Sequence, residues 1–514
     1  MFNKKIRKIA SVALAGSMVL SMAACGNESE DPKTTPTPTT AAKPSDDDKQ
    51  LDNNNPGNTD DQQGDNDQQG DNEDPSDDTE KFGCITLPVA PHEGSTPRTI
   101  RVGSWYDFWY DSNDEDIYSN PNVGDLEEAQ MQFDNLKRVE EKYNIRLEYV
   151  NLTWEGVTES ISTSIMSGTP DCDIYMVDLI GMGVPAMFNG YVAALEDFMP
   201  AEADIFNDQN VLKNFKMPDA DKSYFFTSVG GNNGGCLLGF NADMIDEAGL
   251  ENPQDLYDRG EWTWEKFREY CKALTKDTDG DTVIDQWGYS GFFTDMFASL
   301  LMSNNAHVAG GEKEGLSSPA TIEVLDFAHQ LYMVDKTARP FDIANWDLNA
   351  SIYNTGTVGF WTTQIWFQHA NGLSSDVGFE IGMVPWPIGP SGNQETNSQV
   401  VAGGSWYFIP VGVERPELVL SVFEEITNWY DGDVTLRDNT EWNEDGCETE
   451  RNWGYMKAAG ETMPWFDLWG NISGLSAIQD VIAVNGGEAS TAAQAAEKYK
   501  QVVQDYIDTY LKSN

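Results

Sequence analysis

The sequence predicts an α/β protein of two lobes, each a mostly parallel sheet flanked by helices, joined by a hinge. Three observations predict this. Strand and helix patterns alternate from Arg98 to Val177, and a second alternation opens at Leu237. Between them the stretch Ser223–Asn233 (SYFFTSVGGNN) ends in paired glycines, whose backbone freedom suits a crossing between lobes. The 514 residues also exceed what a single hydrophobic core usually holds.

The first 24 residues predict a signal peptide that is not part of the fold. Lysines and an arginine between residues 4 and 8 precede the apolar run Ile9–Leu20, which is too short for a stable membrane anchor. Ser21-Met22-Ala23-Ala24 then leads into Cys25, a lipobox pattern that predicts a lipid-modified (palmitate-bearing) cysteine. The alternative is ordinary secretory cleavage near Ala24. We expect a lipoprotein on the extracytoplasmic face of the cell membrane, held there by the lipid alone.

Residues 25–96 predict a disordered acidic linker. They are rich in Asp, Asn, Gln, Thr and Pro, contain the near-repeat DQQGDNDQQGDN, and have few large apolar side chains. Such a segment cannot bury enough apolar surface to offset the entropy of ordering. We interpret it as a solvated tether.

The net charge indicates which classes of ligand the protein is not expected to bind. The chain has 85 acidic and 32 basic residues, a formal charge of −53, and the linker holds only a minority of the acids. A phosphate backbone would be repelled, so the composition argues against nucleic-acid binding. The 6 cysteines and 4 histidines show no zinc spacing. One disulfide remains possible, without an assignment.

The first lobe is expected to begin as β-α-β-α-β. The elements, in order, are a strand at 99–103, a helix at 125–143, a strand at 145–150, a helix at 153–166 and a strand at 174–177. Parallel strands with right-handed crossovers end at one edge of the sheet, where ligands of such sheets bind. Trp105 and Asp178 follow two of these strand ends.

Four short patterns follow one another between Gly235 and Phe292. The strand Leu237–Phe240 leads into a helix that carries Asn241, Asp243, Ala248 and Gly249. Thr263 is placed to N-cap a second helix, with Trp264 and Phe267 in its first turns. The stretches Leu274–Asp281 and Asp285–Gly288 complete the series.

This series resembles the central signature of the family 1 extracellular solute-binding proteins, the sugar-capturing subunits of bacterial ABC importers. Tyr353, Gly356, Phe360 and Trp366 also fall in register with a second family block, although Gly359 and Gln364 replace its usual Ala and Gly. The resemblance implies a two-lobed, type II periplasmic-binding-protein-like fold. It also implies that Trp366 lies against a sugar ring.

The same resemblance implies where the chain passes from one lobe to the other. We expect lobe 1 to comprise residues 97–230 and 403–460, and lobe 2 residues 231–402 and 461–514. Residues 431–469 match no family block. Together with the loop at 106–122, they are expected to select the ligand.

The loop at 277–285 (DTDGDTVID) predicts a structural calcium site. Calcium takes six to eight hard oxygen ligands, which alternate carboxylates and a backbone carbonyl can supply. The expected ligands are Asp277, Asp279, Asp281, Val283 and Asp285. The alternative is a solvated acidic turn.

Sugar-binding side chains are expected among the 16 tryptophans, although most of these will lie in the core. Flat apolar rings with a polar edge suit the C–H faces of sugars. Four tryptophans stand at predicted strand ends or crossings, and two polar residues stand where hydroxyls would be bound. These candidates are Trp105, Trp366, Trp386, Trp406, Asp178 and Asn233.

Together these patterns predict a monomeric binding protein that closes on an oligosaccharide and delivers it to the transmembrane subunits of an ABC permease, without breaking a bond. The alternative is a secreted glycoside hydrolase or polysaccharide lyase, which needs two carboxylates facing each other across the cleaved bond. No recognisable motif supplies that pair. A surface adhesin is a third interpretation, and it would show no closure of lobes.

Overall fold

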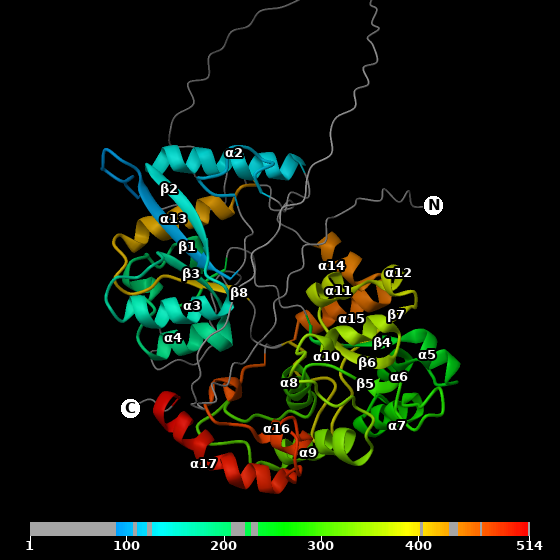
Figure 1. Ribbon diagram of the computed structural model, residues 1–514. Helices are drawn as coiled ribbons and strands as arrows, with labels where there is room; N and C mark the ends of the chain where they lie inside the picture. The colour runs from blue at the N-terminus through cyan, green and yellow to red at the C-terminus, as the bar shows by residue number, and fades with distance from the viewer. Residues whose placement is uncertain are drawn as a thin grey trace, which may run out of the picture. The chain divides into compact units, whose positions relative to one another are not determined.

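The computed structural model describes residues 89–105, 110–120, 126–206, 222–227, 235–400, 405–430, 440–462 and 465–511. The predictions for the signal peptide, Cys25, most of the linker and Asn233 lie outside these residues. Within them, no helix combines the length and the apolar character that crossing a bilayer would require. The α/β class is confirmed, because two four-stranded sheets are each packed against helices (Figure 1).

The first sheet has the strand order β2-β1-β3-β8. Its strands are β1 (Arg98–Ser104), β2 (Ile145–Asn151), β3 (Ile174–Asp178) and β8 (Ser405–Phe408). β1 pairs in parallel with β2 and with β3, as the crossover pattern predicts, and β8 runs antiparallel to β3. The helices and short turns of this half are α2 (Leu126–Tyr143), α3 (Trp154–Ser160), η1 (Ile161–Ile165), η2 (Leu179–Gly183), α4 (Val184–Phe188), η3 (Leu195–Asp197), η4 (Asp204–Phe206) and α13 (Pro416–Thr427).

A buried carboxylate joins α13 to α2. The Glu425 side chain is 1% exposed and pairs with Arg138 at 3.1 Å and Lys142 at 2.8 Å. It also accepts a hydrogen bond from the Tyr143 hydroxyl. A buried charge is tolerated when it is paired and hydrogen-bonded in this way.

The second sheet has the order β5-β6-β4-β7. Its strands are β4 (Leu237–Asn241), β5 (Trp287–Tyr289), β6 (Val358–Thr363) and β7 (Ile381–Val384). β5 and β6 are parallel, but β4 runs antiparallel to both β6 and β7. The prediction of a mostly parallel sheet is therefore wrong for this half. Strands buried on both faces have the same continuous apolar composition in either direction, so the sequence could not distinguish them.

The signature region folds as the sequence predicts. Asn241 N-caps α5 (Ala242–Glu247), and Thr263 accepts a hydrogen bond from the Lys266 amide at the start of α7 (Trp264–Leu274). The buried face of α7 includes Phe267, Tyr270, Cys271 and Leu274. The other helices and turns of this region are α6 (Pro253–Asp258), α8 (Phe293–Ser303), α9 (Pro319–His329), η5 (Gln330–Val334), α10 (Leu348–Ser351), η6 (Ile352–Thr355), α11 (Ile365–Asn371) and α12 (Ser374–Val377).

Two helices near the C-terminus depart from the predicted division of the chain. α14 (Thr440–Cys447) and α15 (Glu450–Gly460) were expected in lobe 1, but they pack against the second sheet. Cys447 and Met456 share a core cluster with Leu237 and Met383. The sequence-based boundary is wrong here because this segment matches no family block, and its apolar residues find their partners only in the folded chain.

Asn452 fixes α15 to the sheet. Its side chain accepts from the Met383 amide and from the Gln254 amide group, both at 2.9 Å. It donates to the carbonyls of Ile381 at 3.0 Å and Cys447 at 2.8 Å. Because Asn452 is 1% exposed, all of its hydrogen-bonding capacity is used inside the protein.

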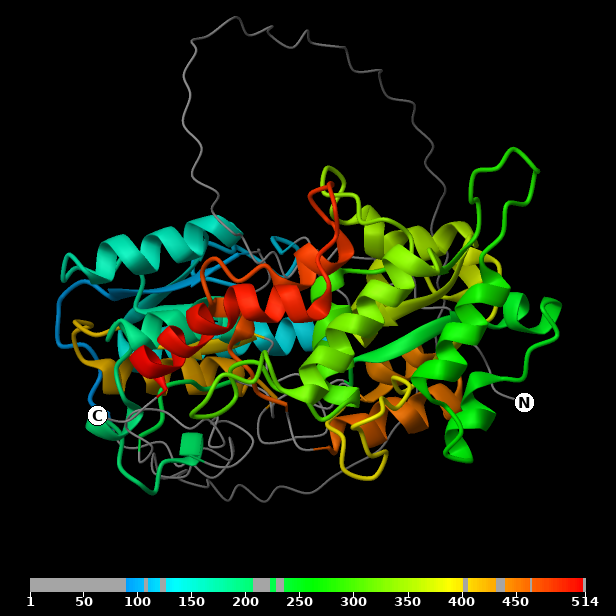
Figure 2. The ribbon, with the colours of Figure 1, turned by 90° about the horizontal axis from the view of Figure 1, so that it is seen from below.

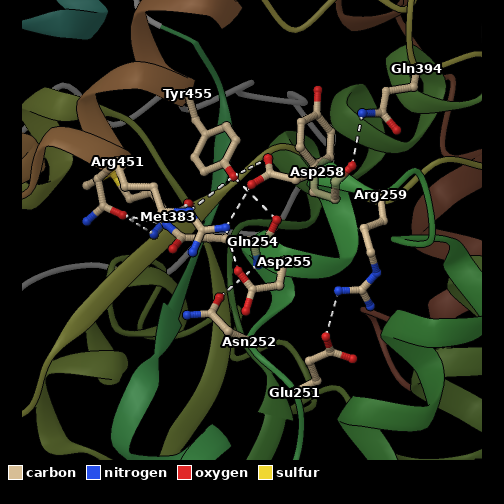
Figure 3. A network of polar contacts seen from close by, with 12 residues as sticks. Glu251, Asn252, Gln254, Asp255, Asp258, Arg259, Met383, Gln394, Arg451 and Tyr455 are labelled. Atoms are coloured by element: carbon tan, nitrogen blue, oxygen red, sulfur yellow. Dashed lines mark hydrogen bonds and ion pairs between the residues drawn. The ribbon is translucent and has the colours of Figure 1, made fainter.

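A surface network continues this contact toward solvent (Figure 3). Arg451 bridges Asp255 at 2.7 Å and Asp258 at 2.8 Å, and both carboxylates belong to α6. The Tyr455 hydroxyl donates to Asp258 at 2.6 Å. Exposed ion pairs of this kind each contribute little to stability, so the buried hydrogen bonds of Asn452 stabilise the contact between α15 and the sheet more strongly.

The chain ends in α16 (Ala477–Ile482) and α17 (Ala492–Tyr510), which pack against each other and against α9 (Figure 2). Thr491 and Gln494 form a capping box at the start of α17. The cysteines at 172, 236, 271 and 447 are buried free thiols, so no disulfide joins any of these four.

Candidate functional site

The first sheet brings three of the predicted residues to one edge. β1 and β3 are parallel and end there, and the antiparallel β8 begins there, with Asp178 opposite Ser405. Trp105 follows β1, is half-buried, and meets Trp154 edge-on at 5.3 Å between ring centroids. Trp406 lies opposite Val177, but it is only 8% exposed and belongs to the core.

Asp178 is a desolvated carboxylate at this edge. It is the last residue of β3, is 8% exposed, and accepts a hydrogen bond from the Gly181 amide at 2.6 Å. Burial raises its pKa to about 6, against the lowering effect of hydrogen bonds from the Gly181 and Ile180 backbone. No basic side chain of the described residues forms an ion pair with it, so a hydroxyl donor is a suitable partner.

The second sheet has a corresponding edge. β5 and β6 run in the same direction, β7 is also antiparallel to β4, and Thr363 and Val384 lie opposite Leu237 and Leu238. Three strands therefore end where β4 begins. The loops that follow β5, β6 and β7 leave the sheet from this edge.

Trp366 lies at this second edge, in the first turn of α11 directly after β6. It is half-buried, and its Nε1 donates to the Gln364 side-chain oxygen at 2.9 Å. Gln364 is the residue that replaces a glycine of the family pattern. Here it fixes the orientation of the indole ring.

Asp295 is a site residue that the sequence analysis missed. It lies in the first turn of α8, which follows β5. Although the side chain keeps some exposure, burial raises its pKa to about 6. Its charge also raises the pKa of the Cys236 thiol, in addition to the larger effect of burial. A lone carboxylate in the otherwise apolar helix FTDMFASLLMS was the signal that could have revealed it.

The 3-10 turn η8 (Trp469–Asn471) contacts the surroundings of both carboxylates. The Asn471 side-chain amide donates to the Ile180 carbonyl at 2.7 Å, two residues after Asp178. The half-buried Trp469 ring meets Phe297, two residues after Asp295, edge-on at 5.0 Å. Trp469 is therefore a further candidate aromatic residue, from the end of the stretch that the sequence left unassigned.

Trp386 lies largely in the core. It is 6% exposed and packs edge-to-face against Phe267 and Tyr289 at centroid distances of 6.2 and 6.1 Å. Trp386 and Trp406 are therefore mostly buried, and their roles as ligand-binding side chains stay predictions. A tryptophan near a strand end is buried whenever the chain beyond it folds back over the sheet.

The acidic loop brings three of its four carboxylates together. Oxygens of Asp277, Asp279 and Asp285 lie within 4.8 Å of one another. Asp281 is not in this group, and its carboxylate instead accepts from the Val283 amide at 2.7 Å. Hydrogen bonds from Thr278 lower the pKa of Asp285. Converging ionised carboxylates are the donor set that a hard cation requires, so this part of the loop fits calcium.

This is a two-lobed α/β binding protein. Each lobe has one sheet, and candidate aromatic and carboxylate side chains lie at the edge where several of its strands end. Residues 136–428, more than half of the chain, match the family model of bacterial extracellular solute-binding proteins, and the protein belongs to that family. No protein with a curated description matches the chain.

Solved structures share the fold at low sequence identity. An ABC substrate-binding protein of Listeria monocytogenes in complex with cycloalternan is 15% identical, with a TM-score of 0.54 over 80% of this chain and 99% of that one. The GacH receptor of Streptomyces glaucescens, solved unliganded and with acarbose, is 13% identical, with a TM-score of 0.53 over 80% and 99%. The maltose/maltodextrin-binding domain of Bdellovibrio bacteriovorus, bound to maltotriose, is 13% identical, with a TM-score of 0.52 over 80% and 100%.

Proposed function

We propose that this solute-binding protein captures a carbohydrate, an oligosaccharide, outside the cytoplasm and delivers it as a monomer to the permease of an ABC importer. The observation that carries the proposal is that one turn, η8, contacts Ile180, two residues after Asp178, and Phe297, two residues after Asp295. Trp366 lies at the edge of the second sheet, at the end of β6. Sugars present apolar C–H faces to aromatic rings and hydroxyls to carboxylates. The sugar ligands of the similar structures support this class of ligand.

Calorimetric titration with malto-, cello- and xylo-oligosaccharides tests the proposal. We expect one of these series to bind, and we expect Asp178→Asn and Trp366→Ala each to weaken that binding about tenfold or more. Asp197→Asn is the matched control, because Asp197 is exposed on the same half and pairs only with Lys222 among the described residues. A protein that binds peptides or polyamines, and none of the glycans, would refute the ligand class.

We further propose that the bound sugar leaves unchanged. A glycoside hydrolase is the alternative. Such an enzyme needs one carboxyl group of raised pKa as its general acid and a second, ionised carboxylate as base or nucleophile, and burial raises the pKa of both Asp178 and Asp295. Incubation of the protein with a glycan that it binds, followed by chromatography, separates the two. Stoichiometric recovery supports a binding protein, and products that disappear in Asp178→Asn and Asp295→Asn variants support the enzyme.

The proposal also includes a lipid anchor and a bound calcium ion. The lipobox around Cys25 supports a lipid anchor on the outer face of the cell membrane. Cys25→Ala should release the protein from the membrane fraction into the medium. The converging carboxylates of Asp277, Asp279 and Asp285 support a structural calcium ion that would hold the end of α7 to the start of β5.

A further inference from the structure

Beyond the edge of the second sheet, α11 and α14 lie side by side (Figure 1), and an aromatic contact joins them. The imidazole of His369 stacks on the indole of Trp442 at a centroid distance of 4.4 Å and an interplanar angle of 20°. His369 Nε2 lies 2.9 Å from the Trp442 carbonyl oxygen. A carbonyl can only accept, so Nε2 carries a proton, and in the tautomer with its single proton on Nε2 the other nitrogen, Nδ1, is an acceptor. Nothing in the described chain forms a hydrogen bond with Nδ1.

Trp366 lies on the same side of α11 as His369. Residues three apart on a helix are neighbours, with about 5–6 Å between their Cβ atoms. Trp366, His369 and Trp442 are all half-buried, so each keeps part of its ring at the surface. This spacing places Trp366, at the proposed sugar site, next to the stacked pair, and we call the three rings the α11–α14 strip.

The strip is held by rigid contacts on both helices. Gln364 fixes the Trp366 ring at its start. Cys447, at the end of α14, is buried in the cluster with Ile365 of α11. A binding surface on packed helices keeps its geometry better than one on a loop. α14 also lies beyond residue 428, where the family match ends.

We propose that the α11–α14 strip is a second sugar subsite, which takes a further unit of an oligosaccharide whose first unit lies against Trp366. This rests on the proposed function. The apolar face of the sugar would lie on the strip, and one hydroxyl would donate to His369 Nδ1. The chemistry favours a neutral glycan of three or more units over a mono- or disaccharide.

The test is calorimetric titration of oligosaccharide ladders of two to six units from the malto-, cello- and xylo- series. For wild-type protein we expect affinity to rise with length beyond two units. Trp442→Ala should lose about tenfold in affinity for the longer members, the size of one aromatic contact, and retain wild-type affinity for the disaccharide. Trp442→Phe should restore most of the loss.

Two further variants keep the test decisive if Trp442→Ala unfolds. His369→Phe keeps a flat ring but removes the acceptor, so it should lower affinity for the longer glycans and leave the disaccharide unchanged. Trp453→Ala, on α15, is the matched control and should bind like wild type. If His369→Phe, and also Trp442→Ala where it folds, show the wild-type dependence on length, the subsite is refuted while the proposed function stands. If no ladder binds at all, both are refuted.

Discussion

The Asn471 side chain donates a hydrogen bond to the Ile180 carbonyl at 2.7 Å, across 291 residues of sequence. Ile180 lies in the turn that Asp178 caps, and the neighbouring Trp469 contacts α8 through Phe297. A single turn therefore links the surroundings of both desolvated carboxylates. We infer that this hydrogen bond helps to set how Asp178 meets a ligand.

Replacement of Asn471 should weaken ligand binding more than it weakens the fold. Asn471→Ala loses one partly buried hydrogen bond, about 1 kcal/mol, so we expect roughly a fivefold loss of glycan affinity by calorimetry. Asn189→Ala is the control, because its amide makes the same type of bond, to the Pro185 carbonyl, within one short helix. Equal affinities for the two variants would show that the turn does not position the site.

Replacement of Asp178 should change the pH dependence of stability. Its pKa rises from 3.8 in the unfolded chain to about 6 in the folded protein, so the folded state favours the protonated form. The stability that this preference contributes is full below pH 3.8 and is lost as the pH rises through about 6. Asp178→Asn, which stays neutral, should therefore be more stable than wild type at pH 7, by an amount on the order of 2 kcal/mol.

Urea unfolding of both proteins, measured from pH 4 to pH 8 in steps of about one pH unit, gives this difference in stability. The difference should shrink toward acid pH. A difference that is constant with pH would mean that Asp178 has the same pKa in both states.

Replacement of Gln364 should act through Trp366. Gln364→Leu removes the acceptor of the indole Nε1 hydrogen bond, so the ring would lose its fixed orientation. We expect a loss of glycan affinity of about threefold to tenfold, smaller than that for Trp366→Ala. In the Trp366→Phe background, which lacks the indole donor, Gln364→Leu should have little further effect. Additive losses would contradict the coupling.

Removal of calcium should lower the melting temperature of wild-type protein. Calcium at 100 times its Kd would stabilise the fold by about 2.7 kcal/mol, which a thermal scan with and without chelator detects. Asp279→Asn should abolish the response, because Asp279 belongs to the converging group. Asp281→Asn is the control and should keep most of it, since Asp281 lies outside that group. No response in wild type would identify the loop as a solvated turn.

Replacement of Asn452 should be far more costly than replacement of its neighbour Arg451. Asn452→Ala removes four buried hydrogen bonds, for an expected loss of about 3 kcal/mol in the free energy of unfolding. Arg451→Ala breaks only partly exposed ion pairs, for about 0.5 kcal/mol or less. Denaturant midpoints of the two variants test this contrast, and similar losses would contradict it.

Local patterns in the sequence predicted much of the fold and part of the site. The caps at Asn241 and Thr263, the apolar face of α7 and the parallel pairing of β1 with β2 follow from residues close together in the chain. Asp178 could be placed at a strand end for the same reason. Such features depend on hydrogen bonds and periodicities that span only a few residues.

The sequence by itself determined the class of protein, the order of its helices and strands, and the strand ends that are expected to contact a ligand. Only the tertiary structure decided that the second sheet is mainly antiparallel and that α14 and α15 join it. It also decided that Trp386 and Trp406 are buried, and that Trp469 contacts the helix that carries Asp295. The physical reason is that strand direction and the burial of a side chain depend on partners distant in sequence, such as Ile180 and Asn471, which no local pattern specifies.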